Sequence, residues 1–232
     1  MEILVALGGL ALATLLIIRN ICRRSRRRTR VNKIMVYVEG NIGVGKTTLL
    51  QKLAEKGYPV VQEPVKLWTD CNGVNFLDLY SKDLPKWAFT FQTLALFSIW
   101  HEQAEACGNQ PIIIMERSVH SVVKMFALNQ FKNGFLSLPQ YLLLEKLSQM
   151  LSGRFKRREV FIYLHTTAKE AHQRMKLRAR SEETGLSLQY FQQLQEILLG
   201  WMTKEEKLQL VVNASQGPQE VFRVVERFLQ AL

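Results

Sequence analysis

From residue 33 to the C-terminus, short apolar runs alternate with stretches in which apolar residues recur every three or four positions. The short runs predict β-strands and the periodic stretches predict helices. The strands are expected at residues 34–39, 59–63, 111–116, 159–165 and 208–214. The helices are expected at residues 46–56, 84–106, 120–150 (as two helices), 168–180, 187–203 and 218–231. Strands separated by helices predict an α/β fold with a doubly wound, parallel five-stranded sheet, whose ligands gather at the carboxyl ends of the strands.

Two of the predicted helices carry start signals of their own. The pattern Thr167-Ala-Lys-Glu170 is a capping box, in which the two polar side chains bind backbone N–H groups of the first turn. Pro218 suits the first position of a helix, where no N–H group is needed. No internal repeat interrupts the alternation, so residues 33–232 are expected to form one domain that is large enough to bury a core.

The stretch VEGNIGVGKTTLL joins the first predicted strand to the first predicted helix. It contains the P-loop pattern G-x-x-x-x-G-K-[ST], in which glycines turn backbone N–H groups toward one anion, Lys46 reaches the β- and γ-phosphates, and Thr47 offers its hydroxyl to Mg²⁺. A plain glycine-rich turn is the alternative, but a strand before the pattern and a helix after it favour the P-loop. The residues expected to bind ATP here are Gly40, Asn41, Ile42, Gly43, Val44, Gly45, Lys46, Thr47 and Thr48.

The net charge of the 232 residues is +11, which by itself would indicate a nucleic-acid partner. Most of this charge is local, because residues 1–33 contain eight Lys or Arg and one acid and so account for +7. The remaining +4 suits small phosphate ligands, so no specific nucleic acid is expected. The three cysteines show no C-x-x-C pattern and the four histidines no metal-ligand spacing, which argues against a disulfide framework or a zinc site and favours a reducing compartment.

Residues 1–32 form a separate segment, an apolar block followed by an arginine-rich linker. Residues 3–18 are uncharged, and a helix of this length, at about 1.5 Å per residue, reaches roughly 24 Å, short of the ~30 Å hydrocarbon core. If Arg19 snorkels to the interface, residues 3–22 reach about the lower limit for a membrane span. Such an anchor would hold the rest of the chain in the cytoplasm, because the basic flank stays on that side. A mitochondrial targeting segment is the alternative, since arginines abound and acids are nearly absent; a cleaved secretory signal fits less well, because its charge order is reversed.

A carboxylate at the end of the second predicted strand is a candidate catalytic base. Glu63, in the sequence QEP, is expected at the edge of the sheet where the P-loop also lies. There it would orient or deprotonate a substrate hydroxyl, which contributes about 10²- to 10⁴-fold to a rate. A surface glutamate beside a turn is the alternative interpretation.

The predicted helix at residues 84–106 carries an amide among aromatic residues. Gln92 follows Trp87 and Phe91, and Trp100 lies two turns later. A side-chain amide pairs in both directions with the edge of a nucleobase while aromatic rings stack on its face. An aromatic core stripe with one polar outlier explains the same pattern, so this stretch alone does not establish a nucleobase pocket.

Basic residues alternate near the end of the predicted helix at residues 168–180. The stretch RMKLRARSEE carries Arg174, Lys176, Arg178 and Arg180, followed by two glutamates. One interpretation is a solvated charge run. The other is a lid that closes cations over a transferring phosphoryl group, a reaction that depends on positioning and on charge neutralisation. The base-reading motif N-K-x-D of G-proteins is absent, which disfavours a GTPase switch.

These clusters occur in the order of a known family and at close to its spacings. The stretches are EPVKLW, NGVNFLDLY, KWAFTFQ, MERSVHS and RARSEE, and with the P-loop they cover the chain from about Lys33 to Trp201. Together they resemble the cellular-type deoxynucleoside kinases. The resemblance implies a P-loop NTPase-type fold with an arginine-rich lid, ATP- and Mg²⁺-dependent phosphorylation of the 5′-hydroxyl of a deoxynucleoside for nucleotide salvage, and a homodimer.

The resemblance also implies catalytic roles for individual residues. Glu63 would be the base for the 5′-hydroxyl, Arg117 would hold the region of the 5′-oxygen, and Lys46 would complete the catalytic set. Thr47 and Glu116 would bind Mg²⁺.

Further roles concern the lid and the nucleoside. Arg178 and Arg180 would be the lid arginines that help to bind ATP, Gln92 would pair with the nucleobase, and Glu183 would hold the sugar 3′-hydroxyl. The residues expected to bind the substrate are Glu63, Trp68, Leu77, Tyr80, Phe91, Gln92, Ala95, Ile99, Arg117, Val122, Phe126 and Glu183.

Two features depart from the family. The usual tyrosine partner of the 3′-hydroxyl aligns without a gap on Ser81, while a tyrosine stands one place earlier at Tyr80, so either residue is a candidate for this contact. The N-terminal apolar block has no counterpart in the resemblance.

The nucleobase preference is expected to follow from three positions, Ala95, Ile99 and Val122. Ile99 and Val122 resemble the positions at which the deoxycytidine kinases of the family carry an arginine and an aspartate. Apolar walls neither accommodate nor pair a purine well, whereas a pyrimidine needs the amide of Gln92 and stacking, and Ala95 leaves room for a thymine methyl group. Thymidine and deoxycytidine are therefore the expected substrates.

Two rival functions remain open at this point. A nucleoside monophosphate kinase also needs lid arginines but would have to hold a substrate phosphate. A membrane-tethered protein that binds nucleic acid or a partner, with a vestigial kinase site, would use the basic N-terminal segment instead.

Overall fold

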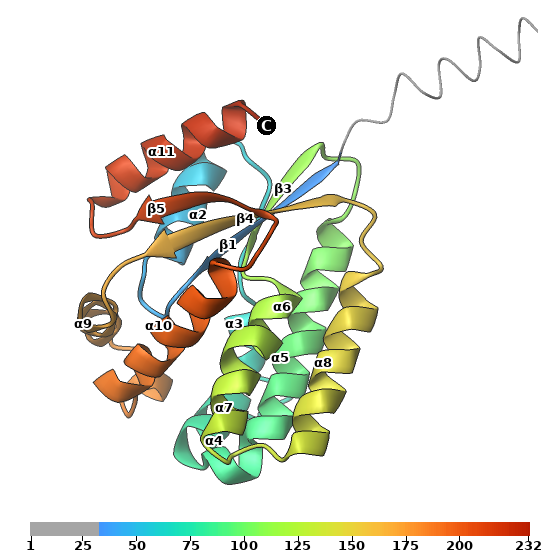
Figure 1. The fold of residues 1–232 in the computed structure, drawn as a ribbon, viewed down its shortest axis with the longest axis vertical. Helices are drawn as coiled ribbons and strands as arrows, with labels where there is room; N and C mark the ends of the chain where they lie inside the picture. Colours follow the sequence, from blue (N-terminus) through green and yellow to red (C-terminus); the bar gives the residue numbers. More distant parts are fainter. Residues whose placement is uncertain (1–32) are drawn as a thin grey trace, which may run out of the picture. The chain divides into compact units, whose positions relative to one another are not determined.

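The computed structural model describes residues 33–232, of which Ile34–Leu232 form one compact unit. The predicted apolar block and arginine-rich linker therefore lie outside the described residues. Five parallel strands form the central sheet in the order β2-β3-β1-β4-β5 (Figure 1). The strands are β1 (Ile34–Gly40), β2 (Val60–Val61), β3 (Ile112–Glu116), β4 (Arg158–His165) and β5 (Leu208–Asn213). The predicted parallel five-stranded α/β sheet is confirmed, although β2 is much shorter than the strand expected at residues 59–63.

The helices that follow the strands include most of the predicted ones. They are α2 (Lys46–Glu55), α3 (Val65–Thr69), α4 (Phe76–Lys82), α5 (Leu84–Ala106), α6 (Val119–Ser121), the π-helix η1 (Val122–Ala127), α7 (Leu128–Lys132), α8 (Leu138–Ser152), α9 (Ala168–Arg178), the 3₁₀-helix η2 (Ser181–Glu183), α10 (Leu188–Met202) and α11 (Pro218–Gln230). The prediction missed α3, α4 and η2, because helices of five, seven and three residues are too short to show a period of 3.6. Among residues 33–232, no helix is long and apolar enough to cross a membrane.

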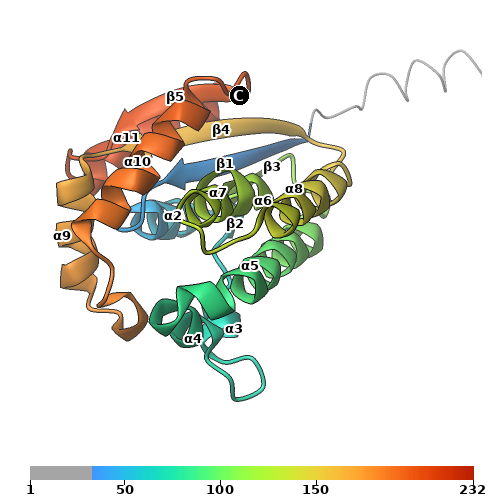
Figure 2. The ribbon, with the colours of Figure 1, turned by 60° about the horizontal axis from the view of Figure 1, so that its bottom comes forward.

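The period-2 pattern of β1 explains how helices cover both faces of the sheet. Ile34, Val36 and Val38 belong to the core shared with α2 and α11, whereas Met35 and Tyr37 belong to the core shared with α10. Successive side chains of a strand point to opposite faces, so a strand that is buried along its whole length must have helices on both sides. Figures 1 and 2 show these layers, with α3, α4 and α5 on one side of the carboxyl ends of the strands and α9 on the other.

The predicted helical stretch 120–150 is divided, and its first part is irregular. A break at residues 133–137 separates α7 from α8, where Gly134 has a φ of 76° and Pro139 lies in the first turn of the next helix. Before the break, the π-helix η1 changes the direction of successive side chains, and both Val122 and Phe126 line the cavity described below. π-Helices frequently occur at functional sites.

The start signals of α9 and α11 are only partly as predicted. The hydroxyl of Thr167 accepts the N–H of Glu170 at 3.1 Å, which is half of the capping box. The carboxylate of Glu170 does not complete it and instead accepts hydrogen bonds from Thr166, Ser215 and Arg174. Pro218 occupies the first turn of α11, as predicted. The glutamate thus ties α9 to the loop after β5, a contact that a local motif does not predict.

Candidate active site

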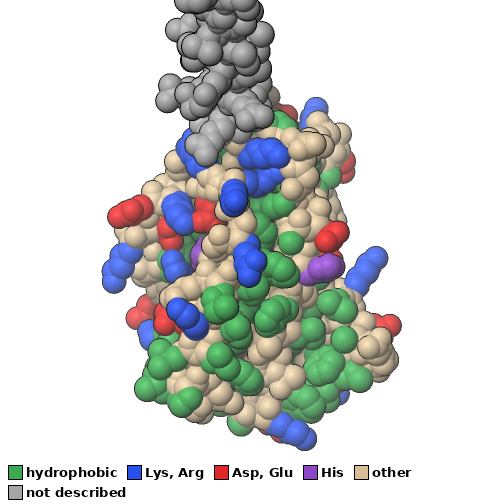
Figure 3. Space-filling model, turned by 90° about the vertical axis from the view of Figure 1, so that its right-hand side faces the viewer, with side chains coloured by type: hydrophobic (Ala, Val, Ile, Leu, Met, Phe, Trp, Pro, Cys, Tyr) green, Lys and Arg blue, Asp and Glu red, His purple; other side chains and the backbone are tan. Residues whose placement is uncertain are grey.

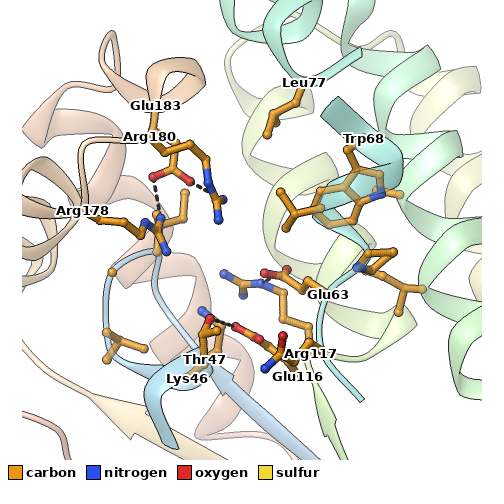
Figure 4. A pocket seen from close by; sticks show the side chains of 18 of the residues that line it. Lys46, Thr47, Glu63, Trp68, Leu77, Glu116, Arg117, Arg178, Arg180 and Glu183 are labelled. Atoms are coloured by element: carbon orange, nitrogen blue, oxygen red, sulfur yellow. Dashed lines mark hydrogen bonds and ion pairs between the residues drawn. The ribbon is translucent and has the colours of Figure 1, made fainter. Parts of the chain in front are cut away.

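A continuous cavity of about 1710 Å³ lies at the carboxyl ends of the strands. Its floor is the P-loop, one wall comes from α3, α4, α5 and η1, and the opposite wall comes from α9 and η2. Figure 4 shows Lys46 and Thr47 at the floor, Trp68 and Leu77 on one wall, and the lid residues Arg178 and Glu183 across from them. The cavity therefore brings together residues from the whole length of the described chain.

The P-loop is held in place by its own lysine and by contacts with other elements. The buried ammonium of Lys46 donates to the carbonyl of Asn41 at 3.0 Å, and burial beside Arg117 lowers the pKa of Lys46 to about 8 against the opposing effect of nearby carboxylates. Gly43 has a φ of 73°, and a Cβ atom there would lie 2.3 Å from the carbonyl oxygen of Ala171 on α9. A glycine is required at this point by both the backbone conformation and the closeness of the lid helix.

Two oxygen-bearing residues meet beside the P-loop. The hydroxyl of Thr47 donates to Oε1 of Glu116 at 2.7 Å. Glu116 ends β3 and is buried; burial and the nearby carboxylate of Glu63 raise its pKa. Hydroxyl and carboxylate oxygens are the ligands that Mg²⁺ prefers, so this pair fits Mg²⁺ chemically. Within the described part of the chain, no three His, Cys, Asp or Glu side chains cluster as a metal site. Mg²⁺ that is held by one or two protein groups together with substrate phosphates needs no such cluster.

The candidate base is paired with the candidate arginine. Glu63 lies in the loop after β2, with its side chain 18% exposed, and its Oε1 is 2.6 Å from Nε of Arg117. Arg117 follows β3 directly, is buried, and has a φ of 65°, which is unusual for a residue with a side chain. Its guanidinium also donates to the carbonyl of Gly40 at 3.0 Å and lies 4.8 Å from the ring of Phe126. Arg117 thus joins the P-loop, the base and the wall of the cavity.

One carboxylate binds both lid arginines. Glu183 accepts a hydrogen bond from Arg178 and, at 2.8 Å, one from Arg180, and its side chain is only 9% exposed (Figure 4). Helix α9 ends at Arg178 rather than at the predicted residue 180, because Ala179 adopts the left-handed conformation with a φ of 52°. This turn directs both arginines toward the same glutamate.

Aromatic side chains line the same cavity as the buried amide of Gln92. Trp68 and Phe91 make an edge-to-face contact with ring centroids 5.6 Å apart, and Tyr80 stacks on Phe91 at 4.5 Å. The indole N–H of Trp68 donates to the hydroxyl of Ser98 at 2.8 Å, which fixes the tryptophan ring. The wall combines flat apolar surface with one amide, which is what recognition of a nucleobase requires.

The two candidates for the sugar contact differ in their surroundings. Ser81 lines the cavity, and its hydroxyl donates to the carbonyl of Asp78 at 2.9 Å. Tyr80 also lines the cavity and accepts a hydrogen bond from Gln130, and its hydroxyl interacts with that of Tyr190 on α10. Burial raises the pKa of Tyr80 and raises that of Tyr190 to about 12, so both hydroxyls stay neutral.

The cavity gathers almost all of the predicted site residues. Every residue expected to bind the substrate lines it, as do the lid arginines, Glu116 and the P-loop from Ile42 to Thr48. Gly40 and Asn41 do not line it. The buried side chain of Asn41 instead donates to the carbonyl of Phe191 at 3.0 Å and so ties the P-loop to α10.

Sequence analysis did not predict the place of Tyr190 in the cavity wall, nor the contact of Arg174 with the P-loop. Tyr190 lies in the amphipathic pattern of α10 and reads as a core residue, so no local signal identified it. Arg174 was visible in the basic run, and its guanidinium donates to the P-loop carbonyl of Val44 at 3.2 Å. The alternation of basic residues signals the lid but not which of them faces the cavity.

Known proteins are similar to this chain over nearly all of the described domain. The family model for deoxynucleoside kinase matches residues 36–229. The thymidine kinase of Ictalurid herpesvirus 1 is 34% identical, over 83% of this chain and 85% of its own length. The probable deoxycytidine kinase of fowlpox virus is 32% identical, over 74% and 73%, and the mitochondrial thymidine kinase 2 of Homo sapiens is 29% identical, over 88% and 78%. The chain therefore belongs to the deoxynucleoside kinase family and is an enzyme that phosphorylates nucleosides.

Proposed function

We propose that this enzyme transfers the γ-phosphoryl group of ATP to the 5′-hydroxyl of a pyrimidine deoxynucleoside, with Mg²⁺, and thereby supplies deoxynucleoside monophosphates for salvage. One observation carries the proposal: the carboxylate of Glu63 is held by Arg117 in the same cavity as the P-loop lysine and the amide of Gln92. A hydroxyl acceptor, its base and the phosphate site then lie within one cavity.

In this proposal each residue has a task that its position supports. Glu63 accepts the proton of the 5′-hydroxyl as the oxygen attacks the γ-phosphorus, and Arg117 orients the carboxylate and the attacking oxygen. Lys46, Arg178 and Arg180 hold the phosphates and neutralise charge as it moves to the leaving oxygen. Positioning and charge neutralisation are the main sources of catalysis in phosphoryl transfer.

Mg²⁺ would neutralise charge on the β- and γ-phosphates when bound. Thr47 and Glu116 are the residues that would hold it, because their oxygens already meet at 2.7 Å beside the P-loop. The hydrogen bond between them keeps the carboxylate directed toward the phosphate floor.

The first prediction concerns the base. Glu63→Gln is expected to lower kcat by about 10²-fold or more with little change in thymidine affinity, because it removes the proton acceptor and keeps the shape. Steady-state kinetics with thymidine and ATP, together with thymidine binding measured by calorimetry, provide the check.

Glu102→Gln is the matched control, since Glu102 is another carboxylate of the cavity wall and has no role in the proposed mechanism. Near-normal turnover of the Glu63 variant would refute the role of Glu63. Chromatography of the products with thymidine and with thymidine monophosphate as acceptors tests the rival function, because a nucleoside monophosphate kinase would make the diphosphate.

The preference for pyrimidines rests on the cavity wall near Gln92. Ala95, Ile99 and Val122 are all buried and apolar and all line the cavity. A purine has a larger ring system and other polar edge groups, and a polar group buried there without a partner costs about 1–3 kcal/mol. The relatives include thymidine, deoxycytidine and deoxyguanosine kinases, so the similarity alone does not choose the base.

The second prediction is that thymidine and deoxycytidine exceed deoxyadenosine and deoxyguanosine by roughly tenfold or more in kcat/KM, the factor that about 1.4 kcal/mol supplies. A panel of the four deoxynucleosides with labelled ATP measures this ratio. A purine deoxynucleoside that matches thymidine would contradict the assignment of the wall and leave the kinase function intact.

We also propose that the enzyme is a homodimer, with α8 at the interface. Four large hydrophobic residues of this helix are exposed, and Phe97 of the neighbouring α5 is exposed as well; those of α8 are Leu138, Leu142, Leu143 and Met150. Figure 3 views the molecule from the side on which α8 lies, and hydrophobic side chains gather there. Contiguous exposed apolar surface commonly marks a protein interface.

The third prediction follows from this surface. Leu143→Glu is expected to convert a dimer into a monomer, because it would bury a charge at the interface. Val211→Glu is the control, since Val211 is also exposed (57%) but lies on β5, away from α8. Sedimentation velocity at several protein concentrations distinguishes the species. A monomeric wild-type enzyme, or an unchanged Leu143 variant, would argue against this interface.

The fourth prediction concerns residues 1–32, for which we propose a membrane anchor that leaves the kinase domain in the cytoplasm. A membrane-inserted apolar segment is expected to keep the protein in the membrane fraction at high salt, whereas purely electrostatic attachment is screened. Removal of residues 1–32 is expected to release the protein and preserve its turnover. Import with loss of the N-terminus would support the mitochondrial alternative, and loss of turnover would favour a binding function for the basic segment.

A further inference from the structure

Glu39 is a carboxylate that sequence analysis passed over and that the proposed mechanism does not use. It precedes the P-loop on β1, the central strand of the sheet, and its side chain is completely buried. Its Oε1 accepts the N–H of Ser118 at 2.9 Å and the hydroxyl of Ser118 at 2.7 Å. Its Oε2 is buried without a hydrogen bond and lies 3.9 Å from Nη1 of Arg117. A buried carboxylate is costly unless it is compensated, so this arrangement requires a reason.

The backbone around Arg117 needs several supports. The residue has a left-handed conformation, which is strained for a residue with a side chain and persists only where surrounding contacts enforce it. Its N–H donates to the carbonyl of Val38 at 3.1 Å, and its carbonyl accepts from the amide of Gln103 at 3.2 Å. Glu39 holds the next residue, Ser118, through both of its donors. The strained turn is thus held by contacts of Arg117 itself and of Ser118, the residue that follows it.

We propose that Glu39 is a positioning residue that acts through Arg117: it anchors the turn at Ser118 with one oxygen and draws the guanidinium toward β1 with the other, so that Nε of Arg117 faces Glu63. The inference rests on the proposed function of Arg117 and Glu63 in proton abstraction. Without the charge of Glu39, the guanidinium loses the carboxylate on its inner side, and the pair with Glu63 loosens.

The charges around Glu39 are consistent with this role. Burial raises the pKa of Glu39 to about 7, while Arg117, the hydrogen bonds from Ser118 and the ammonium of Lys46 lower it. Tyr37, two residues earlier on β1, also interacts with Glu39. Because the folded-state pKa lies above the ordinary value, protonation below about pH 7 removes the charge that faces Arg117.

The test compares Glu39→Gln with the wild type in turnover, in the affinities for thymidine and ATP, and in thermal unfolding. The amide keeps an acceptor for Ser118 and removes the charge. We expect kcat to fall roughly tenfold with both dissociation constants nearly unchanged. Glu39→Asp, which keeps the charge on a shorter side chain, is expected to recover part of this loss. It also serves as the second variant if the glutamine substitution impairs folding.

Ser118→Ala is the matched control for a merely structural role. It removes one of the hydrogen bonds to Glu39 and leaves the charge in place. If Glu39 served only to anchor the turn, the Ser118 variant and the Glu39 variant would lose stability and kcat in parallel. That outcome would overturn the proposal. We expect the Ser118 variant to lower the unfolding temperature and to retain kcat within about threefold.

A double-mutant cycle with Arg117→Lys separates this proposal from the proposed function. If Glu39 acts through Arg117, Glu39→Gln is expected to change kcat by less than about twofold in the Arg117→Lys enzyme. Additive losses in kcat would overturn the role of Glu39 alone. A fully active Arg117→Lys enzyme would overturn the role of Arg117 and the Glu39 proposal with it.

The pH dependence gives an independent readout. The ratio of wild-type to Glu39→Gln turnover is expected to fall toward one as the pH decreases from 8 to 5.5, because protonated Glu39 resembles glutamine. Taking the ratio cancels the titration of groups that both enzymes share. A ratio that stays constant over this range would contradict the proposal.

Discussion

The ion pair between Arg117 and Glu63 is the interaction on which the arrangement of the cavity depends. It links the turn after β3 to the loop after β2, two segments that are far apart in the chain, and it forms between largely buried groups. A buried charge without its partner is strongly destabilising, so each member of the pair fixes the other. The left-handed backbone of Arg117 and the contacts of Glu39 and Gln103 serve the same geometry.

One side chain of the lid, that of Glu183, is expected to serve both the phosphate end and the sugar end of the cavity. Glu183 neutralises Arg178 and Arg180, the two cations expected to meet phosphates, although the same carboxylate is expected to meet the sugar. The contact of Gly43 with the backbone of Ala171 brings the lid helix against the P-loop itself. The phosphate floor, the lid and the nucleoside wall are therefore coupled by packing and by charge, and not only by closeness.

The candidate site was largely predictable because its parts are local in sequence. The P-loop pattern names its lysine and threonine directly, and the resemblance named Glu63, Arg117 and the lid arginines, all of which line one cavity or its floor. The residues that escaped prediction, Glu39 and Tyr190 among them, lie within strand and helix patterns that read as core. Their roles come from partners 79 and 110 positions away, Ser118 for Glu39 and Tyr80 for Tyr190, and no local pattern encodes a distant partner.

The alternation of apolar runs and amphipathic stretches by itself determined the parallel sheet, the succession of strands and helices along the chain and the edge at which ligands gather, because burial of a strand on both faces demands helices on both sides. Only the tertiary structure decided that β2 has two residues, that η1 is a π-helix and that one glutamate binds both lid arginines. These features are settled by packing and by the pairing of buried charges between distant segments. Hydrophobic periodicity reports the burial of a residue, but it does not report the group that the residue faces.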